Sequence, residues 1–196
     1  NQVVYMHITR GVAKRDHAFP ENATPTVFAM TNPFTPPTLE SIGEGLSVIS
    51  VPDERWLHCD IKSISLLGNI LARQTAVEAG AIEAVLFRDG YLTEGASSNI
   101  WVVKDGKLLA PPHDNLILEG IRYELMEELA RRSGIPFEAR RISQDEVRNA
   151  DELLLTAATK EVKPITRLDG QPVGKGVPGP IFHKLFAAYQ EAKAQR

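Results

Sequence analysis

Apolar side chains follow two different periods along the chain, and the shorter period predicts strands. Runs rich in β-branched and aromatic residues at 3–9, 26–30 and 45–52 are typical of β-strands. Further along, three Asp-Gly pairs follow strand-like runs, and such pairs supply the positive φ angles that a tight hairpin turn needs. These pairs are Asp89-Gly90, Asp105-Gly106 and Asp169-Gly170. We therefore expect antiparallel sheet built from hairpins.

The longer period, three to four residues, is that of an amphipathic helix. It predicts helices at 63–79, 121–133 and 181–192, the first two closed by Gly80 and Gly134. The residues expected to face the core are Leu67, Ile70, Leu71 and Val77, then Ile121, Leu125, Met126 and Leu129, then Leu185, Phe186 and Tyr189. Helices mixed with hairpins predict an α/β fold of the mixed α+β kind and disfavour a doubly wound nucleotide fold.

A proline-rich segment divides the chain. Residues 33, 36 and 37 are all prolines, which fix φ and suit a stiff, extended connector. We expect a first domain at 1–35, a linker at 36–40 and a larger domain at 41–196. Because the sequence opens directly in a strand and without methionine, we also expect that the N-terminal part of the first domain is missing.

Composition narrows the possible partners. The 196 residues are 43% hydrophobic and carry a formal net charge of -3, so there is no basic surface of the kind that binds nucleic acid or an anionic membrane. No apolar run approaches the roughly 20 residues that span a bilayer. The single cysteine, Cys59, forms no disulfide within the chain and fits the cytoplasm. The five histidines lack metal-ligand spacing, so we expect no metal.

One familiar motif is better explained without a ligand. The glycines at 174, 176 and 179 match the Gly-x-Gly-x-x-Gly spacing of dinucleotide sites, but Pro178 and Pro180 interrupt the turn. The chain also ends before an acidic ribose-binding residue could follow. We interpret this segment as a plain loop.

Two charged residues stand where chemistry is possible. Lys62 precedes the first predicted helix among apolar neighbours, where desolvation would favour the neutral amine that attacks carbonyls. A lysine whose stem lies on apolar surface explains the same pattern. Glu94 ends a short strand before a hydroxyl-rich turn, and on the sequence alone a solvated turn carboxylate is the simpler interpretation.

Two further patterns point to anion binding. Arg15 and His17 would project to one side of an extended segment and suit a carboxylate, although a solvated basic loop fits equally. Gly120 precedes the second predicted helix, whose free amides could bind phosphate, but it also suits a simple cap. Small residues at 156–159 would either admit a ligand close to the backbone or ease a turn.

Taken in order, these pieces resemble the D-amino-acid aminotransferases, pyridoxal-phosphate enzymes of fold type IV. The resemblance is carried by Thr9-Arg10-Gly11 with Arg15-x-His17, by Cys59-Asp60-Ile61-Lys62-Ser63, by Thr93-Glu94-Gly95 with Ser97-Ser98-Asn99, and by Leu118-x-Gly120-Ile121. It runs across nearly the whole chain. It implies a homodimeric, ping-pong transaminase that moves an amino group from a D-amino acid such as D-alanine to a 2-oxo acid such as 2-oxoglutarate.

The resemblance also implies roles for single residues. Lys62 would carry pyridoxal 5'-phosphate as a Schiff base and move the proton, while Glu94 would face the pyridine nitrogen. Arg15 and His17 would bind the substrate α-carboxylate. The remaining cofactor-binding residues implied are Leu118, Gly120, Ile121, Arg122 and Ala158.

The chain departs from the family pattern at the phosphate. Arg122 stands where a threonine is usual, and Ala157-Ala158 replaces a Ser-Thr pair. Backbone amides would still bind phosphate. The alternatives are a branched-chain L-amino-acid aminotransferase or an aminodeoxychorismate lyase of the same fold, which do not as a rule carry the Arg-x-His pair, and a non-catalytic binding domain.

Overall fold

The computed structural model describes residues 1–195, which divide into two compact units. The first unit covers residues 1–36 and the second begins at Pro37. The division therefore falls within the proline-rich segment. A short helix, α1 (Leu39–Ile42), begins inside the stretch expected to be a linker, and Thr38 caps it.

The first unit is a two-stranded antiparallel hairpin. β1 (Gln2–Thr9) pairs along its length with β2 (Thr26–Pro33), so the two predicted strands are confirmed and the second extends to the proline. Most of its residues are exposed. The loop between the strands carries Arg15 and His17.

The second unit contains a mixed sheet whose strands run in the order β5-β4-β3-β10-β9-β6-β7-β8, with β11 beside β10. Its strands are β3 (Leu46–Pro52), β4 (Glu83–Arg88), β5 (Tyr91–Gly95), β6 (Asn99–Lys104), β7 (Lys107–Ala110), β8 (Phe137–Ala139), β9 (Glu152–Ala157), β10 (Glu161–Leu168) and β11 (Gln171–Pro172). The pairs β3–β4, β3–β10 and β7–β8 are parallel and the others antiparallel. The fold is thus mixed α and β, as expected.

The three predicted hairpins are confirmed. β4–β5, β6–β7 and β10–β11 are antiparallel pairs joined at the Asp-Gly dipeptides. The aspartates Asp89, Asp105 and Asp169 have φ angles of 50° to 52°, and the glycines after them 73° to 78°. Positive φ at both central residues is the requirement of a type I′ turn. Local turn chemistry therefore fixes these parts of the sheet.

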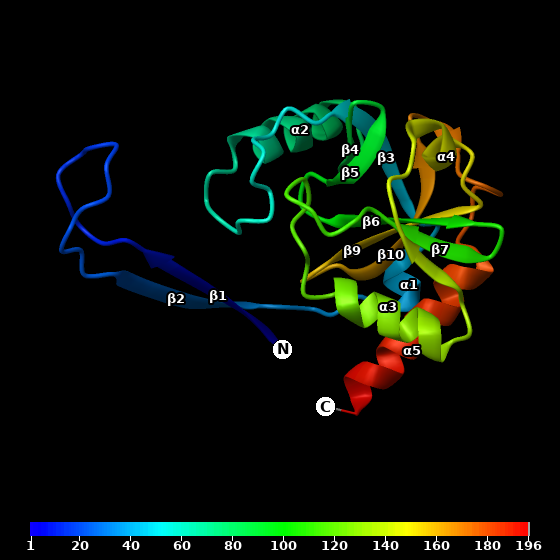
Figure 1. Cartoon of the computed structure of the whole chain (residues 1–196). Coiled ribbons are helices and arrows are strands. Elements are labelled where there is room, and N and C mark those ends of the chain that lie inside the picture. Colours follow the sequence, from blue (N-terminus) through cyan, green and yellow to red (C-terminus); the bar gives the residue numbers. More distant parts are fainter. Residues whose placement is uncertain (196) are drawn as a thin grey trace. The chain divides into compact units, whose positions relative to one another are not determined.

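Two long helices lie on one face of the sheet, and a short helix lies on the other. Alternate residues of β6 separate the two sides: Trp101 and Val103 pack with α3 (Tyr123–Arg132) and α5 (Pro180–Ala194), whereas Ile100 and Val102 pack among neighbouring strands and α4 (Gln144–Arg148). Figure 1 shows α3 and α5 close together near β9 and β10, and their contact is direct.

The first long helix, α2 (Leu67–Glu78), contradicts the prediction made for it. It begins four residues later than expected, and its four large apolar residues are 51% to 69% exposed rather than buried: Leu67, Ile70, Leu71 and Val77. Ala72 and Ala76 face β3 and β4 instead, against Ala84 and Leu86. Small side chains let this helix lie close to the sheet, and the bulky ones are left outside.

The other two helices are confirmed with one exception. Met126 and Leu129 of α3 are buried, as are Leu185, Phe186 and Tyr189 of α5, and Leu125 is partly buried. Ile121 is 83% exposed because α3 begins only at Tyr123. No helix of residues 1–195 is long and apolar enough to cross a membrane.

Candidate functional site

Glu94 is a buried carboxylate near the end of β5, not the solvated turn residue that its local sequence suggests. Only 4% of the residue is exposed. One oxygen, Oε1, accepts a hydrogen bond from Nη1 of Arg55. The other, Oε2, accepts from the backbone amide of Leu118 at 3.1 Å and from Nδ2 of Asn99 at 3.2 Å. The side chain is therefore held by three donors from three different segments.

The protonation of Glu94 is finely balanced. Burial raises its pKa, whereas the charge and hydrogen bond of Arg55 and the amide of Leu118 lower it, so that the pKa is about 7 instead of 4.5. A carboxyl group that titrates near neutral pH inside a protein is typical of functional sites. Small changes in its partners will therefore decide whether Glu94 carries charge.

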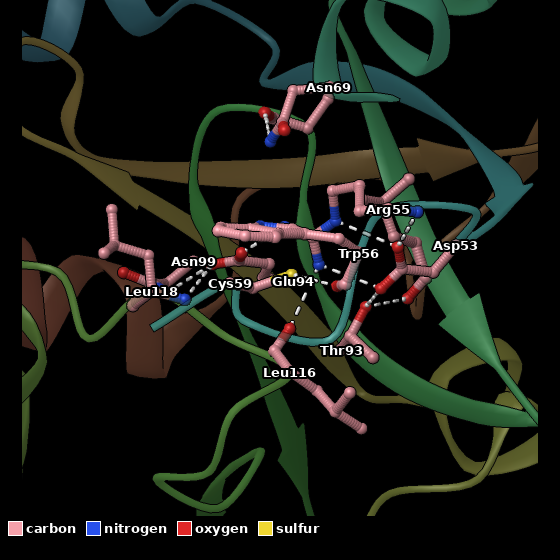
Figure 2. Close-up of polar contacts among 12 residues, drawn as sticks. Asp53, Arg55, Trp56, Cys59, Asn69, Thr93, Glu94, Asn99, Leu116 and Leu118 are labelled. Atoms are coloured by element: carbon pink, nitrogen blue, oxygen red, sulfur yellow. Dashed lines mark hydrogen bonds and ion pairs between the residues drawn. The ribbon is translucent and has the colours of Figure 1, made fainter. Parts of the chain in front are cut away.

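Arg55 links Glu94 to a second buried carboxylate, Asp53. Nε and Nη2 of Arg55 donate to the two oxygens of Asp53 at 2.9 Å each, and Nη2 also reaches the carbonyl of Leu116 at 3.1 Å. Figure 2 shows the two carboxylates joined through this guanidinium. Burial would lower the pKa of Arg55, but both carboxylates raise it, and the side chain stays charged.

Asn99 ties this cluster to the segment before α3. Its Nδ2 donates to the carbonyl of Leu118 at 2.8 Å as well as to Glu94. A Cβ added at Gly120 would lie 2.3 Å from the amide oxygen of Asn99. Glycine is thus required at position 120 because the backbone passes against Asn99. The structure therefore brings together Glu94, Leu118 and Gly120, three of the residues implied to bind cofactor.

Arg122 joins the start of α3 to the turn between β9 and β10. Its Nε donates to the carbonyl of Ala157 at 2.9 Å, and its Nη2 donates to the carbonyl of Ala158 at 2.6 Å. The guanidinium also lies 5.2 Å from the ring centre of Tyr189. Among the described residues no side chain caps the amides that open α3. Arg122, Ile121 and Ala158 are hence close neighbours.

The start of α5, where the Gly-x-Gly-x-x-Gly spacing ends, is already filled. Both oxygens of Glu152 accept from the amides of Ile181 and Phe182, at 2.9 and 2.8 Å. A Cβ at Gly179 would lie only 2.2 Å from Glu152. A carboxylate of the chain itself occupies the place a phosphate would take. The interpretation of 174–179 as a plain loop is confirmed.

Lys62 does not lie in the packed, dry segment expected of it. It is exposed, on the connection between β3 and α2, and its neighbours Ile61 and Ile64 are 52% and 66% exposed. The prediction failed because α2 starts beyond this stretch and packs through its small residues. Within residues 1–195 Lys62 has no hydrogen bond or ion pair. Three residues before it on the same connection is Cys59, whose thiol is buried.

Arg15 and His17 are exposed residues of the β1–β2 loop, in the first unit. The chain bends at both positions, so the argument from an extended segment does not apply to them. The amide of His17 donates to the carboxylate of Asp16 at 2.6 Å, which fixes the local turn. Their role remains a prediction.

Sequence reasoning missed the residues that hold Glu94. Asp53, Arg55 and Arg88 were not singled out, although Asp53 and Arg55 come just after a strand and are each only 8% exposed. Asn99 was named only as part of a motif and without a role. Two opposite charges two residues apart at a strand end are a weak signal. Their partner lies 39 residues further along the chain. Residues 1–195 hold no group of three or more His, Cys, Asp or Glu side chains that could bind a metal.

Known proteins with similar sequences are D-alanine aminotransferases. That of Bacillus licheniformis is 42% identical over 189 residues, which are 96% of this chain and 66% of that protein. That of Staphylococcus aureus (strain MSSA476) is 40% identical over 190 residues, 96% of this chain and 67% of that protein. The chain thus spans about two thirds of the length of these relatives.

Solved structures with the same architecture are branched-chain amino acid aminotransferases of fold type IV. The Thermobaculum terrenum enzyme in its PLP form superposes with a TM-score of 0.83 at 27% identity, over 96% of this chain and 64% of that one. The Escherichia coli enzyme gives a TM-score of 0.84 at 24% identity, over 97% of this chain and 64% of that one, which bears on the fold alone. The family model for amino-transferase class IV matches residues 1–168. The chain belongs to the class IV aminotransferase family.

Proposed function

We propose that this chain is the larger part of a pyridoxal-phosphate-dependent aminotransferase that acts on D-amino acids of the D-alanine type, with a 2-oxo acid of the 2-oxoglutarate type as acceptor. The observation that carries the proposal is the buried carboxylate of Glu94, held by Arg55 on the same connection that bears Lys62. Relatives 40% to 42% identical are D-alanine aminotransferases, which supports the D-amino-acid branch.

The residues present fit such a cofactor. When bound, pyridoxal phosphate supplies an aldehyde that bonds to amines and a ring that accepts electrons from the substrate Cα. Glu94 offers an anion buried enough to hold a protonated ring nitrogen. The uncapped amides at the start of α3, with Arg122 and Ala158 beside them, suit a phosphate. A groove of about 380 Å³ adjoins Arg55 and is lined by Trp56 and residues 64–69.

Lys62 is the amine that we assign to the aldehyde. The side chain is exposed, and no carboxylate of residues 1–195 forms an ion pair with it. Once displaced from the aldehyde, the free amine can accept the proton from the substrate Cα and return it, which is general base catalysis. No other lysine of the 53–66 connection competes for this role.

Arg15 and His17 are proposed to bind the α-carboxylate of the substrate. An arginine fork and a histidine ring both donate hydrogen bonds to a carboxylate. This pair is the reason to prefer a D-amino-acid substrate over the branched-chain amino acids of the structural neighbours. We further propose that unit 1 is the C-terminal remainder of the small domain and that the enzyme is a homodimer. We also propose that it works in the cytoplasm, which suits a single, buried cysteine.

Reduction with borohydride tests the proposal at one atom. The purified chain is loaded with pyridoxal 5'-phosphate, reduced, digested and mapped by mass spectrometry, since reduction fixes the cofactor permanently to its amine. We expect a single pyridoxyl adduct, on Lys62, and none in Lys62→Ala. Lys175→Ala, at another exposed lysine, is the matched control and keeps the adduct. An adduct elsewhere overturns the assignment, and no adduct at all favours a binding domain without activity.

Substrate class is tested separately on the loaded protein. D-alanine, L-leucine and aminodeoxychorismate are each added, and the loss of the cofactor absorbance band is followed. We expect only D-alanine to bleach the band. Bleaching by L-leucine alone would make the chain a branched-chain enzyme, and conversion of aminodeoxychorismate would make it a lyase.

A further inference from the structure

Asp53 is the most heavily hydrogen-bonded carboxylate around the candidate site. Besides the two side-chain bonds from Arg55, it accepts from the Arg55 amide at 3.1 Å, from Arg88 at 3.1 Å and from the hydroxyl of Thr93 at 2.8 Å. Burial alone would raise its pKa, but these partners lower it to about 2. Asp53 is therefore an anion at any ordinary pH.

The hydrogen bonds to Asp53 determine the orientation of the Arg55 guanidinium. Nε and Nη2 of the guanidinium are both taken by Asp53, and Nη2 is shared with the carbonyl of Leu116. Because the guanidinium is planar and its donors are fixed relative to each other, holding this edge sets the direction of Nη1. Nη1 is the atom that meets Glu94.

The charges around Glu94 balance. The ionisable groups that act on it are Arg55 and Asp53 from the 53–66 connection, with Arg88 at the end of β4 close behind Asp53 and Cys59 in the same connection. Two arginines face two carboxylates, and burial raises the pKa of the Cys59 thiol, so it stays neutral. Arg55 is the one cation in direct contact with Glu94 among residues 1–195.

We propose that Arg55, oriented by Asp53, is a positioning residue that keeps the Glu94 carboxylate ionised and fixed in orientation. Arg55 acts through Glu94 and needs no contact with cofactor or substrate of its own. The inference rests on the proposed function in one respect, namely that Glu94 serves the cofactor as an anion. Burial favours the neutral form of a carboxyl group, so without the guanidinium Glu94 would hold its proton at neutral pH. The proposed role of Glu94 toward the cofactor requires the anion.

The arrangement also explains why position 55 requires arginine rather than lysine. One guanidinium satisfies Asp53, Glu94 and a backbone carbonyl at once, each through a different hydrogen. A lysine amine is a compact charge on a flexible stem and cannot span two carboxylates with fixed geometry. Arg55→Lys should therefore rescue the charge in part but not the orientation.

The test is a direct titration of Glu94 in the whole 196-residue chain without added cofactor. Glutamate labelled with ¹³C at the carboxyl is incorporated, and spectra are recorded from pH 5 to 10. The resonance lost in Glu94→Gln identifies the residue. The series compares the wild type with Arg55→Met, Arg55→Lys and Asp53→Asn. Arg132→Met removes an exposed arginine paired only with Glu128 and serves as the matched control.

We expect the midpoint of Glu94 to rise by roughly one to three pH units in Arg55→Met, the effect of losing a close opposite charge. Arg55→Lys should give a smaller rise, while Arg132→Met leaves the midpoint where it was. Asp53→Asn also removes a negative charge that raises the pKa of Glu94, so this variant should show a smaller change than Arg55→Met. An unchanged midpoint in a folded Arg55→Met protein overturns the proposal. If circular dichroism shows that this variant is unfolded, Arg55→Lys decides, and an unchanged midpoint in a folded Arg55→Lys protein overturns the proposal.

The two proposals fail in different ways. The Glu94 titration is recorded without pyridoxal phosphate, so a missing adduct at Lys62 would refute the proposed function and leave the titration result intact. Conversely, an adduct at Lys62 together with an unchanged Glu94 midpoint would refute only the role of Arg55.

Discussion

The connection between β3 and α2 has two halves that differ in how deeply their charged side chains are buried. Its first half places Asp53, Arg55 and Cys59 in the interior, each no more than 8% exposed, and fixes two of them by opposite charges. Its second half leaves Ile61 and Ile64 more than half exposed around Lys62. A single stretch of chain thus carries both a rigid charged anchor and an exposed amine. Changes in the first half should alter stability, and changes in the second half activity alone.

Replacing Lys62 should have the largest effect and touch activity only. Because the proposed amine both binds the cofactor and moves the proton, Lys62→Ala should lower transaminase turnover at least about 10⁴-fold, the upper end of what acid–base catalysis alone contributes. The side chain is exposed, so the free energy of unfolding should change by less than about 0.5 kcal/mol. Turnover of D-alanine and urea unfolding measure the two quantities. A variant that keeps a tenth of the activity would refute the role of Lys62.

Replacing Asp53 should instead lower the stability of the protein. Asp53→Ala leaves Arg55 and Arg88 with one buried carboxylate between them, and breaking a buried ion pair costs about 3–5 kcal/mol of unfolding free energy. Glu128→Ala, which removes an exposed carboxylate paired with Arg132, should cost under about 1 kcal/mol. Equilibrium denaturation in urea compares the two. Equal losses would show that burial of the Asp53 pair adds nothing.

Some parts of the fold could be predicted from the sequence, and others could not. The three hairpins were predictable because an Asp-Gly turn depends on backbone angles of adjacent residues alone. The buried face of α2 was not, because Ala72 and Ala76 face the sheet while Leu67 and Ile70 remain outside. Periodicity assigns the core to the bulkiest stripe, whereas close packing on β3 and β4 selects the smallest one.

In the candidate site, too, some residues could be predicted from the sequence and others could not. Glu94, Leu118 and Gly120 came from a resemblance of ordered motifs, and the structure brings them together around Asn99. The cluster of Asp53, Arg55 and Glu94 could not be predicted, because its partners are separated by 39 residues and meet only through the fold. Local rules identify turns and caps, but burial of charge is decided by tertiary contacts.

The titration of Glu94 should give the next largest change in stability. Glu94 holds its proton more tightly in the folded protein, with a pKa of about 7 against 4.5, so its contribution is complete below pH 4.5 and disappears as the pH rises through 7. The difference amounts to about 3 kcal/mol. Glu94→Gln should flatten this decline when unfolding is measured from pH 2 to 8 in the protein without cofactor.

Asp53 supplies a control of opposite sign within the same cluster. Its pKa is lowered from 3.8 to about 2, so its stabilisation is present above pH 3.8 and is lost as the pH falls through 2. The Glu94→Gln variant should therefore keep the acid limb of the stability profile and lose only the limb between pH 4.5 and 7. A profile in which both limbs vanish together would contradict the separate assignment of the two carboxylates.

A smaller loss of stability is expected on replacing Arg122. Arg122 is half-buried, whereas Arg55 is buried and Lys62 is exposed. Its hydrogen bonds go to the carbonyls of Ala157 and Ala158 rather than to a carboxylate. Bonds from a charged donor to neutral acceptors that are partly wet should be worth about 1 kcal/mol. Arg122→Ala should lose that much in urea unfolding, and Arg131→Ala, on the exposed end of α3, close to nothing. A loss as large as that of Asp53→Ala would mean that burial and pairing of opposite charges do not distinguish the anchor from the rest of the site.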